Sequence, residues 1–150
     1  IQVEVLCYFY SIKSNLLVKM KKQNTKILLV DDEPDILEIV GYNLLQEGYQ
    51  IFTASNGKEA IQFLESFIDS PELLPEIILL DLTMPVMDGW EFLENYFLLK
   101  PNIGKQVYIY IVSSSVNPID VQKAKNISEV TDYVVKPITK DKFIHLIKNL

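Results

Sequence analysis

Acidic, hydroxyl and basic residues directly follow four short apolar runs of the chain, where they could do chemistry together. They are Asp31, Asp32, Asp81, Ser113 and Lys136. Carboxylates that converge repel one another, so burying them without a partner is costly or raises their pKa values. Mg²⁺ relieves this repulsion because it binds a few carboxylate oxygens and leaves coordination free for a phosphate oxygen. The pattern indicates a site where a carboxylate is a nucleophile toward phosphorus, while a metal and a lysine offset charge.

The elements that would position these residues alternate along the chain from Lys26 onward. Short apolar runs predict strands at 26–30, 49–54, 76–80, 107–112 and 132–135. The segments between and after them predict helices at about 34–47, 57–69, 89–100, 118–126 and 139–150. Pro34, Asn56 and Thr139 lie where helices are expected to begin. Nearly continuous apolar strands alternating with helices are typical of a parallel sheet covered on both faces, an α/β fold.

In such a sheet, the loops at the carboxyl ends of the strands form the ligand crevice. Asp31 and Asp32 follow the first strand and Asp81 follows the third. If these two strands are neighbours, three carboxylates converge within one site.

Residues 1–24 differ in character from the rest of the chain. Residues 1–19 are apolar and aromatic, but Glu4 and Lys13 interrupt runs that are too short to span about 30 Å of hydrocarbon. No small-residue cleavage site follows, so a signal peptide is not indicated. Met20 then opens a polar stretch before the first strand. We expect residues 1–24 to be a leader outside the core and residues 25–150 to form one domain.

Composition excludes several classes of function. The chain has 150 residues, a formal net charge of -6 and no dense basic run, which argues against direct binding of nucleic acid. No segment predicts membrane association. The single cysteine, Cys7, excludes an internal disulfide, so a reducing, cytoplasmic location is expected. His145 is the one histidine and has no cysteine near it, so it is expected to be an ordinary helix residue.

Four segments together resemble the receiver domain of two-component response regulators over about residues 25–150. They are ILLVDDEPDIL at 27–37, IILLDLTMPVMDGWEFL at 77–93, the hydroxyl residue after the fourth strand, and YVVKPIT at 133–139. The resemblance implies a doubly wound, flavodoxin-like sheet of five parallel strands in the order 2-1-3-4-5, as in single-domain chemotaxis regulators. It also implies that a histidine kinase or histidine phosphotransfer protein supplies the phosphoryl group, and that a downstream protein reads the change in shape. Such a chain is a signalling module with only intrinsic autophosphorylation and autodephosphorylation activity, rather than a metabolic enzyme.

The resemblance also implies roles for particular residues. Asp81 matches the phospho-accepting aspartate, and Asp31 with Asp32 matches the acidic pair that holds Mg²⁺. The backbone carbonyl of Thr83 matches the third protein ligand of the metal. Lys136 matches the lysine whose ammonium contacts the phosphoryl group.

The switch residues are implied in the same way. Tyr133 matches the aromatic residue that changes rotamer on phosphorylation, and Pro137 matches a proline that often follows a cis peptide bond. The end of the fourth strand selects Ser113 as the switch hydroxyl. The family's usual spacing to the lysine selects Ser114 instead, unless the loop before the last strand holds one extra residue.

Two other functions stay open. A phosphatase of the haloacid dehalogenase type also uses an aspartate nucleophile and Mg²⁺, but its motif has a second aspartate where this chain has Thr83. A phosphorylation-independent interaction module would keep the receiver fold, but such domains usually lose an acid or the lysine. This chain retains all of them, which favours the phospho-accepting function.

Overall fold

Strands and helices alternate through the chain in the expected order. The computed structural model describes residues 14–17, 23–147 and 150. The strands are β1 (Lys26–Val30), β2 (Gln50–Ala54), β3 (Ile77–Leu80), β4 (Tyr108–Ser113) and β5 (Val130–Val135). The longer helices are α2 (Pro34–Gln46), α3 (Gly57–Ser66), α4 (Gly89–Leu99), α5 (Pro118–Lys125) and α6 (Lys140–Ile147). Two short 3₁₀ helices, which were not expected, are η1 (Pro71–Leu73) and η2 (Lys100–Asn102).

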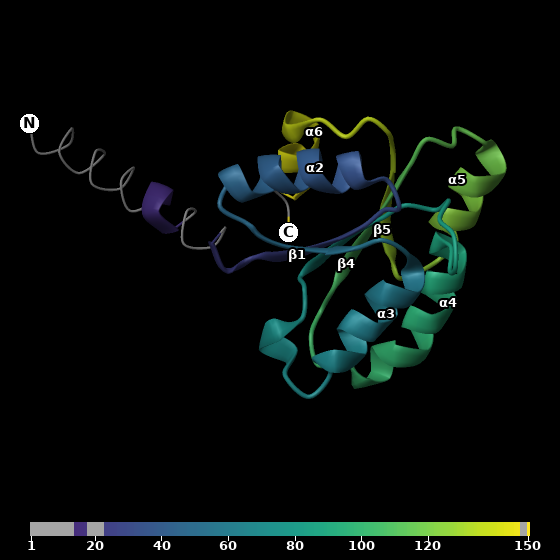
Figure 1. Cartoon of the computed structure of the whole chain (residues 1–150), viewed down its shortest axis with the longest axis horizontal. Coiled ribbons are helices and arrows are strands. Elements are labelled where there is room, and N and C mark those ends of the chain that lie inside the picture. The colour runs from purple at the N-terminus through teal and green to yellow at the C-terminus, as the bar shows by residue number, and fades with distance from the viewer. Residues whose placement is uncertain (1–13, 18–22, 148–149) are drawn as a thin grey trace, which may run out of the picture.

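The five strands form one parallel sheet in the order β2-β1-β3-β4-β5. Helices α2 and α6 cover one face, and α3, α4 and α5 cover the other (Figure 1). The strand order and the three-layer α/β architecture expected from the family resemblance are therefore confirmed. Strands β1 and β3 are neighbours, which brings their carboxyl ends together.

Alternate side chains of each central strand enter two separate apolar cores. In β1, Leu28 packs among the residues of the α3–α5 layer, whereas Ile27 and Leu29 pack beneath α2 and α6. Phe92 of α4 and Phe143 of α6 are buried in the two respective layers. Full burial of one such side chain stabilises the fold by about 1.5–3 kcal/mol. Burial on both faces is the physical reason that the strands read as continuous apolar runs.

Side-chain caps begin the helices where the sequence predicted. The Oδ1 atom of Asn56 accepts a hydrogen bond of 3.0 Å from the Glu59 N–H at the start of α3. Asp88 and Glu91 form a reciprocal capping box at the start of α4. Thr139 accepts a bond of 3.3 Å from the N–H of a residue in the first turn of α6. These predictions of helix starts are confirmed.

Two glycines allow α3 and α4 to approach the loop that follows β3. The Gly57 N–H donates to the Met87 carbonyl over 2.9 Å, and a Cβ atom at Gly57 would lie 2.9 Å from that oxygen. The Gly89 N–H donates to the Leu82 carbonyl over 3.0 Å, and a Cβ atom there would lie 2.4 Å from the Asp81 carbonyl oxygen. Real Cβ atoms do not approach backbone oxygen so closely. Side chains larger than hydrogen are therefore excluded, and the loop is held from two sides.

The last strand contains one residue that has no partner in β4. Ile109 pairs with Val130, but the next residue, Tyr110, pairs with Asp132. Thr131 is therefore a bulge, which adds one residue between the end of β4 and the end of β5. The sequence placed this extra residue in the preceding loop, whereas the structure has it within the strand.

We propose that residues 25–150 form the functional domain and that residues 1–24 lie outside its core. All five strands begin at or after Lys26. Most of the leader lies outside the described residues. In the described part of the chain, no helix is long and apolar enough to cross a membrane.

Deleting residues 1–19 should leave the thermal unfolding midpoint within about 2 °C of that of the full chain, because the deletion removes no strand of the sheet. Circular dichroism of the two proteins at equal concentration measures this difference. A fall of about 5 °C or more would show that the leader packs against the domain.

Candidate functional site

Three carboxylates meet at the carboxyl edge of the sheet. Asp31 directly follows β1 and Asp81 directly follows β3, so the pairing of these strands places the two residues side by side. The Asp81 N–H donates to the Val30 carbonyl over 2.8 Å, which continues the ladder past the end of the strand. One oxygen from each of Asp31, Asp32 and Asp81 lies within 4.8 Å of the others. Asp31 and Asp81 are each 6% exposed, whereas Asp32 is exposed.

Lys136 brings one ammonium group to these acids from the end of β5. Its Nζ atom lies 2.7 Å from Asp31 Oδ2, 3.6 Å from Asp81 Oδ1 and 3.5 Å from Glu33 Oε1. Its backbone N–H donates to the Ser113 carbonyl over 2.8 Å, which fixes where the side chain leaves the sheet. The Lys136–Pro137 peptide bond is cis, as the family resemblance implied. A single ammonium therefore serves several carboxylates, and negative charge is in excess.

Burial and the neighbouring charges together alter the acidity of the site. Burial raises the pKa of Asp81 from 3.8 to about 6, and the charges of Asp31 and Asp32 act in the same direction. The Lys136 ammonium and the Leu82 N–H oppose this rise without cancelling it. Burial by itself would lower the pKa of Lys136, but its hydrogen bond to Asp31 and the surrounding carboxylates outweigh burial and raise the pKa. An additional cation would offset the excess negative charge of the site.

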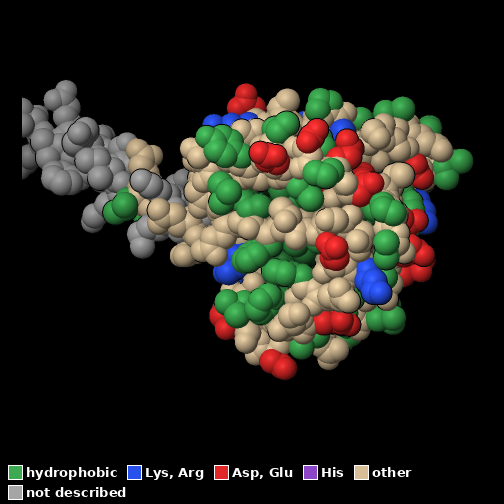
Figure 2. Space-filling model, viewed as in Figure 1, with side chains coloured by type: hydrophobic (Ala, Val, Ile, Leu, Met, Phe, Trp, Pro, Cys, Tyr) green, Lys and Arg blue, Asp and Glu red, His purple; other side chains and the backbone are tan. Residues whose placement is uncertain are grey.

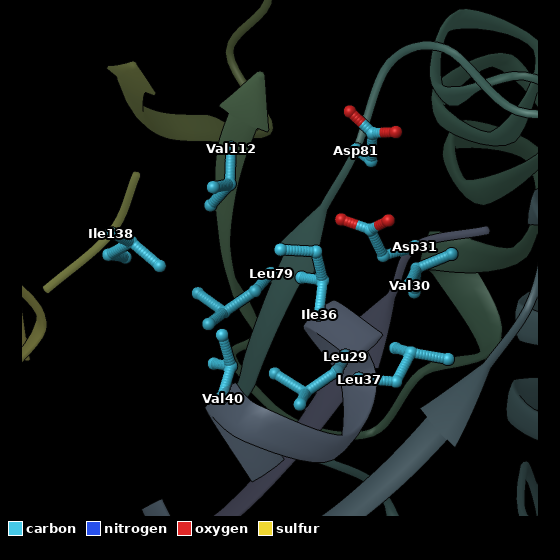
Figure 3. Close-up of a pocket in the computed structure, with 10 residues that line it drawn as sticks. All are labelled: Leu29, Val30, Asp31, Ile36, Leu37, Val40, Leu79, Asp81, Val112 and Ile138. Carbon is cyan, nitrogen blue, oxygen red and sulfur yellow. The ribbon is translucent and has the colours of Figure 1, made fainter. Parts of the chain in front are cut away.

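Apolar side chains make the floor of the site. Figure 3 shows the Asp31 and Asp81 carboxylates at one end of a small pocket between α2 and the sheet. Its apolar lining consists of Leu29, Val30, Ile36, Leu37, Val40, Leu79, Val112 and Ile138. This lining keeps water from one side of the carboxylates, which accounts for the effect of burial on the pKa of Asp81.

The surface near the site is also acidic. Acidic side chains gather over α2 in Figure 2, and its exposed acids include Asp35 and Glu38. Their charge adds to that of the site, because α2 begins two residues after Asp32. Such a field attracts cations to this edge of the sheet.

The two candidate hydroxyl groups differ in burial. Ser113 is the last residue of β4 and is 1% exposed, whereas Ser114 is exposed. The bulge at Thr131 explains why the spacing from Ser113 to the lysine is one residue longer than usual in the family. Tyr133 is half-buried on β5, and its hydroxyl donates to the Ser115 carbonyl over 2.9 Å. Ser113 is the buried one of the two hydroxyl residues, and its role as the switch hydroxyl stays a prediction.

Glu33 adds a further carboxylate near Lys136. It occupies the position directly before α2, but its side chain makes no capping bond. Its carboxylate faces Lys136 instead. The sequence contains an indication of this contact, because Glu33 directly follows the acidic pair at a strand end.

The loop after β3 contains one backbone conformation that side chains rarely adopt. Val86 has a φ of 70°, and its side chain is 76% exposed. A branched side chain is strained in this left-handed region. Thr83 lies earlier in the same loop with an exposed side chain, and the role of its carbonyl as a metal ligand stays a prediction.

Comparisons with known proteins agree with this geometry. The family model of the response regulator receiver domain matches residues 27–148. The response regulator SaeR of Staphylococcus aureus (strain USA300) is 32% identical over 130 residues, which cover 84% of this chain and 50% of that protein. The chain thus spans about half the length of the curated relatives it matches.

Solved structures show the same fold. A chain of the CheX-CheY-BeF3-Mg complex from Borrelia burgdorferi superposes with a TM-score of 0.71 at 24% identity, covering 83% of this chain and 87% of that chain. The chemotaxis protein CheY4 of Vibrio cholerae superposes with a TM-score of 0.70 at 26% identity, and the match covers 83% of this chain and 97% of that chain. With the matched family model, the strand order and the acids at the carboxyl edge in agreement, this chain belongs to the response regulator receiver domain family, the phospho-accepting modules of two-component signalling.

Proposed function

We propose that this receiver takes a phosphoryl group onto a carboxylate oxygen of Asp81, with Mg²⁺ bound beside it. A histidine kinase or a histidine phosphotransfer protein supplies the group, and a downstream protein reads the resulting change. The observation that supports this proposal is the convergence of Asp31, Asp32 and Asp81 with Lys136 at one edge of the sheet. Slow phosphorylation by small donors and slow hydrolysis of the aspartyl phosphate belong to the same proposal.

Asp81 is the proposed nucleophile because it is buried among the other groups and is basic for a carboxylate. In the metal-free site its pKa is about 6, so it is mostly ionised at neutral pH while its oxygens are more basic than those of an ordinary aspartate. A carboxylate oxygen attacks phosphorus while the bond from phosphorus to the donor's histidine nitrogen breaks, which leaves a mixed anhydride on Asp81. Lys136 Nζ is 3.6 Å from Asp81 Oδ1, so its ammonium is in reach of an oxygen of the transferred group.

The carboxylates suit a hard divalent cation. Mg²⁺ takes oxygen ligands at about 2.0–2.1 Å, and oxygens within 4.8 Å of one another need only small shifts to share one ion. Asp31, Asp32 and Asp81 would hold the ion, and Thr83 would add its backbone carbonyl. When bound, the ion offsets the negative charge of the transferred group.

The partners and the location of this receiver belong to the same proposal. The cytoplasmic location expected from the single cysteine and the expected lack of direct nucleic-acid binding stay predictions.

Asp81→Asn should abolish labelling by acetyl phosphate or by a phosphorylated histidine phosphotransfer protein, because an amide cannot form the acyl phosphate. Labelling is measured on the intact chain by mass spectrometry with and without Mg²⁺. Asp88→Asn is the matched control, since it changes an acid of the same loop to a residue that also caps a helix. Full labelling of Asp81→Asn would disprove the assignment of the acceptor.

In a chelator, Asp81→Asn should also be more stable than the wild type near neutral pH. Because the folded-state pKa is raised to about 6, the wild type loses stability as pH rises through that value, whereas an amide does not ionise. We expect an advantage of about 1–3 kcal/mol at pH 7.5 that shrinks as pH falls toward 4. Urea unfolding across this pH range measures it, and equal stability at every pH would contradict the proposed electrostatics. Added Mg²⁺ should narrow the difference, because it binds the wild type more tightly.

Ser113→Ala should still accept a phosphoryl group but lose the coupling to Tyr133, because a methyl group cannot donate a hydrogen bond to the phosphoryl oxygens. NMR shifts around Tyr133 on addition of beryllofluoride with Mg²⁺ report this coupling. Ser114→Ala is the control and should respond as the wild type does, since its side chain is exposed. If Ser114→Ala blunts the shifts and Ser113→Ala does not, the switch hydroxyl is Ser114.

A further inference from the structure

Ser115 lies at the centre of a hydrogen-bonded chain that joins β4, β5 and α5. Its N–H donates to Ser113 Oγ over 3.1 Å, and its carbonyl accepts from the Tyr133 hydroxyl over 2.9 Å. Its own hydroxyl donates to Asp120 Oδ2 over 2.7 Å. The same hydroxyl oxygen accepts from the Asn117 N–H over 3.2 Å. One residue thus bonds to both the proposed switch hydroxyl and the proposed switch aromatic side chain.

The hydrogen bond from the Ser115 N–H leaves the Ser113 hydroxyl proton free to be donated to another acceptor. Among the hydrogen bonds of the described residues, Ser113 Oγ acts only as an acceptor, from the Ser115 N–H. That bond uses one lone pair and directs the hydroxyl proton elsewhere. The proton is then available to an oxygen of a phosphoryl group on the neighbouring strand.

The bond from Ser115 to Asp120 connects this arrangement to a helix. Asp120 is in the first turn of α5, so the loop and the start of the helix are held together. Further along α5, Lys123 Nζ lies 4.1 Å from the centre of the Trp90 ring on α4. A displacement of the loop after β4 would therefore reach the contact between α5 and α4.

We propose that Ser115 and Asp120 form a positioning pair that holds the loop at residues 113–117 in the arrangement that receives a phosphoryl group. The pair acts through Ser113 and Tyr133 and does not itself touch the reacting atoms. The inference rests on the proposed function of Asp81. Holding the loop in advance lowers the ordering cost when the group arrives, so losing the pair weakens the response to phosphorylation.

A purely structural role makes a different prediction. An acid in the first turn stabilises a helix by itself, and the pair would then act only as part of a cap. Asn117 separates the two roles, because its Oδ1 atom accepts from the Ile119 N–H over 3.0 Å and caps the same helix. Asn117→Ala removes a cap at the start of α5 but leaves the hydrogen bonds from Ser115 to Ser113 and to Asp120 in place.

The test is a titration of the full chain with beryllofluoride in the presence of Mg²⁺, followed by the fluorescence of Trp90, the single tryptophan. Ser115→Ala and Asp120→Ala should each raise the beryllofluoride concentration for half-maximal change by about three- to tenfold, as expected for the net loss of one ordinary hydrogen bond at a half-buried site. The double variant should need no higher concentration of beryllofluoride than the more affected single variant, because both substitutions remove the same hydrogen bond. Ser115→Thr keeps the hydroxyl and should restore the wild-type response.

Asn117→Ala is expected to lower the thermal midpoint while leaving the titration within about twofold of the wild type. The inference is overturned if Ser115→Ala and Asp120→Ala also stay within twofold, or if Asn117→Ala weakens the response as much as they do. A wild-type chain that does not respond to beryllofluoride would instead overturn the proposed function, and the inference with it.

Discussion

Repulsion between carboxylates buried at the edge of a parallel sheet is the constraint on which the rest of this receiver depends. The pairing of β1 with β3 forces Asp31 and Asp81 together, and each is almost wholly buried. Lys136 bonds closely to Asp31 and only distantly to Asp81, so the charge of Asp81 is incompletely balanced. A proton, a metal ion or both can supply the balance. The site is therefore sensitive to whatever cation or phosphoryl group reaches it.

The two loops beside this site are held by different kinds of interaction. The loop after β3 is fixed by backbone contacts at Gly57 and Gly89, where there is no space for a Cβ atom. The loop after β4 is held mainly through the hydrogen bonds of Ser115, and Val116 and Ile119 beside it are exposed. Hydrogen bonds between side chains can exchange partners at small cost, whereas close-packed backbone cannot move aside. The loop after β4 is therefore the more suitable element to carry a change away from Asp81.

The bulge in β5 reconciles the position of the hydroxyl with that of the lysine. One unpaired residue, Thr131, lengthens β5 without moving its carboxyl end, so Lys136 still reaches the acids and its N–H still bonds to the Ser113 carbonyl. A bulge absorbs an extra residue by local twisting rather than by shifting the register of the whole strand. The site geometry is thus kept despite an unusual spacing along the chain.

The sequence by itself determined the fold and the acidic side of the site. Strands buried on both faces must be apolar throughout, and the residue after each such run must emerge at the carboxyl edge, so Asp31, Asp81 and Lys136 could be assigned to one edge of the sheet. The strand order that makes β1 and β3 neighbours was implied by the family resemblance and not by the apolar pattern. Only the tertiary structure decided which partners these groups have. Glu33 and Lys136 are 103 residues apart, and the chain from Ser113 through Ser115 to Asp120 depends on how a loop turns. Apolar periodicity reports burial, whereas the choice among polar partners depends on distances of a few ångströms that no local pattern encodes.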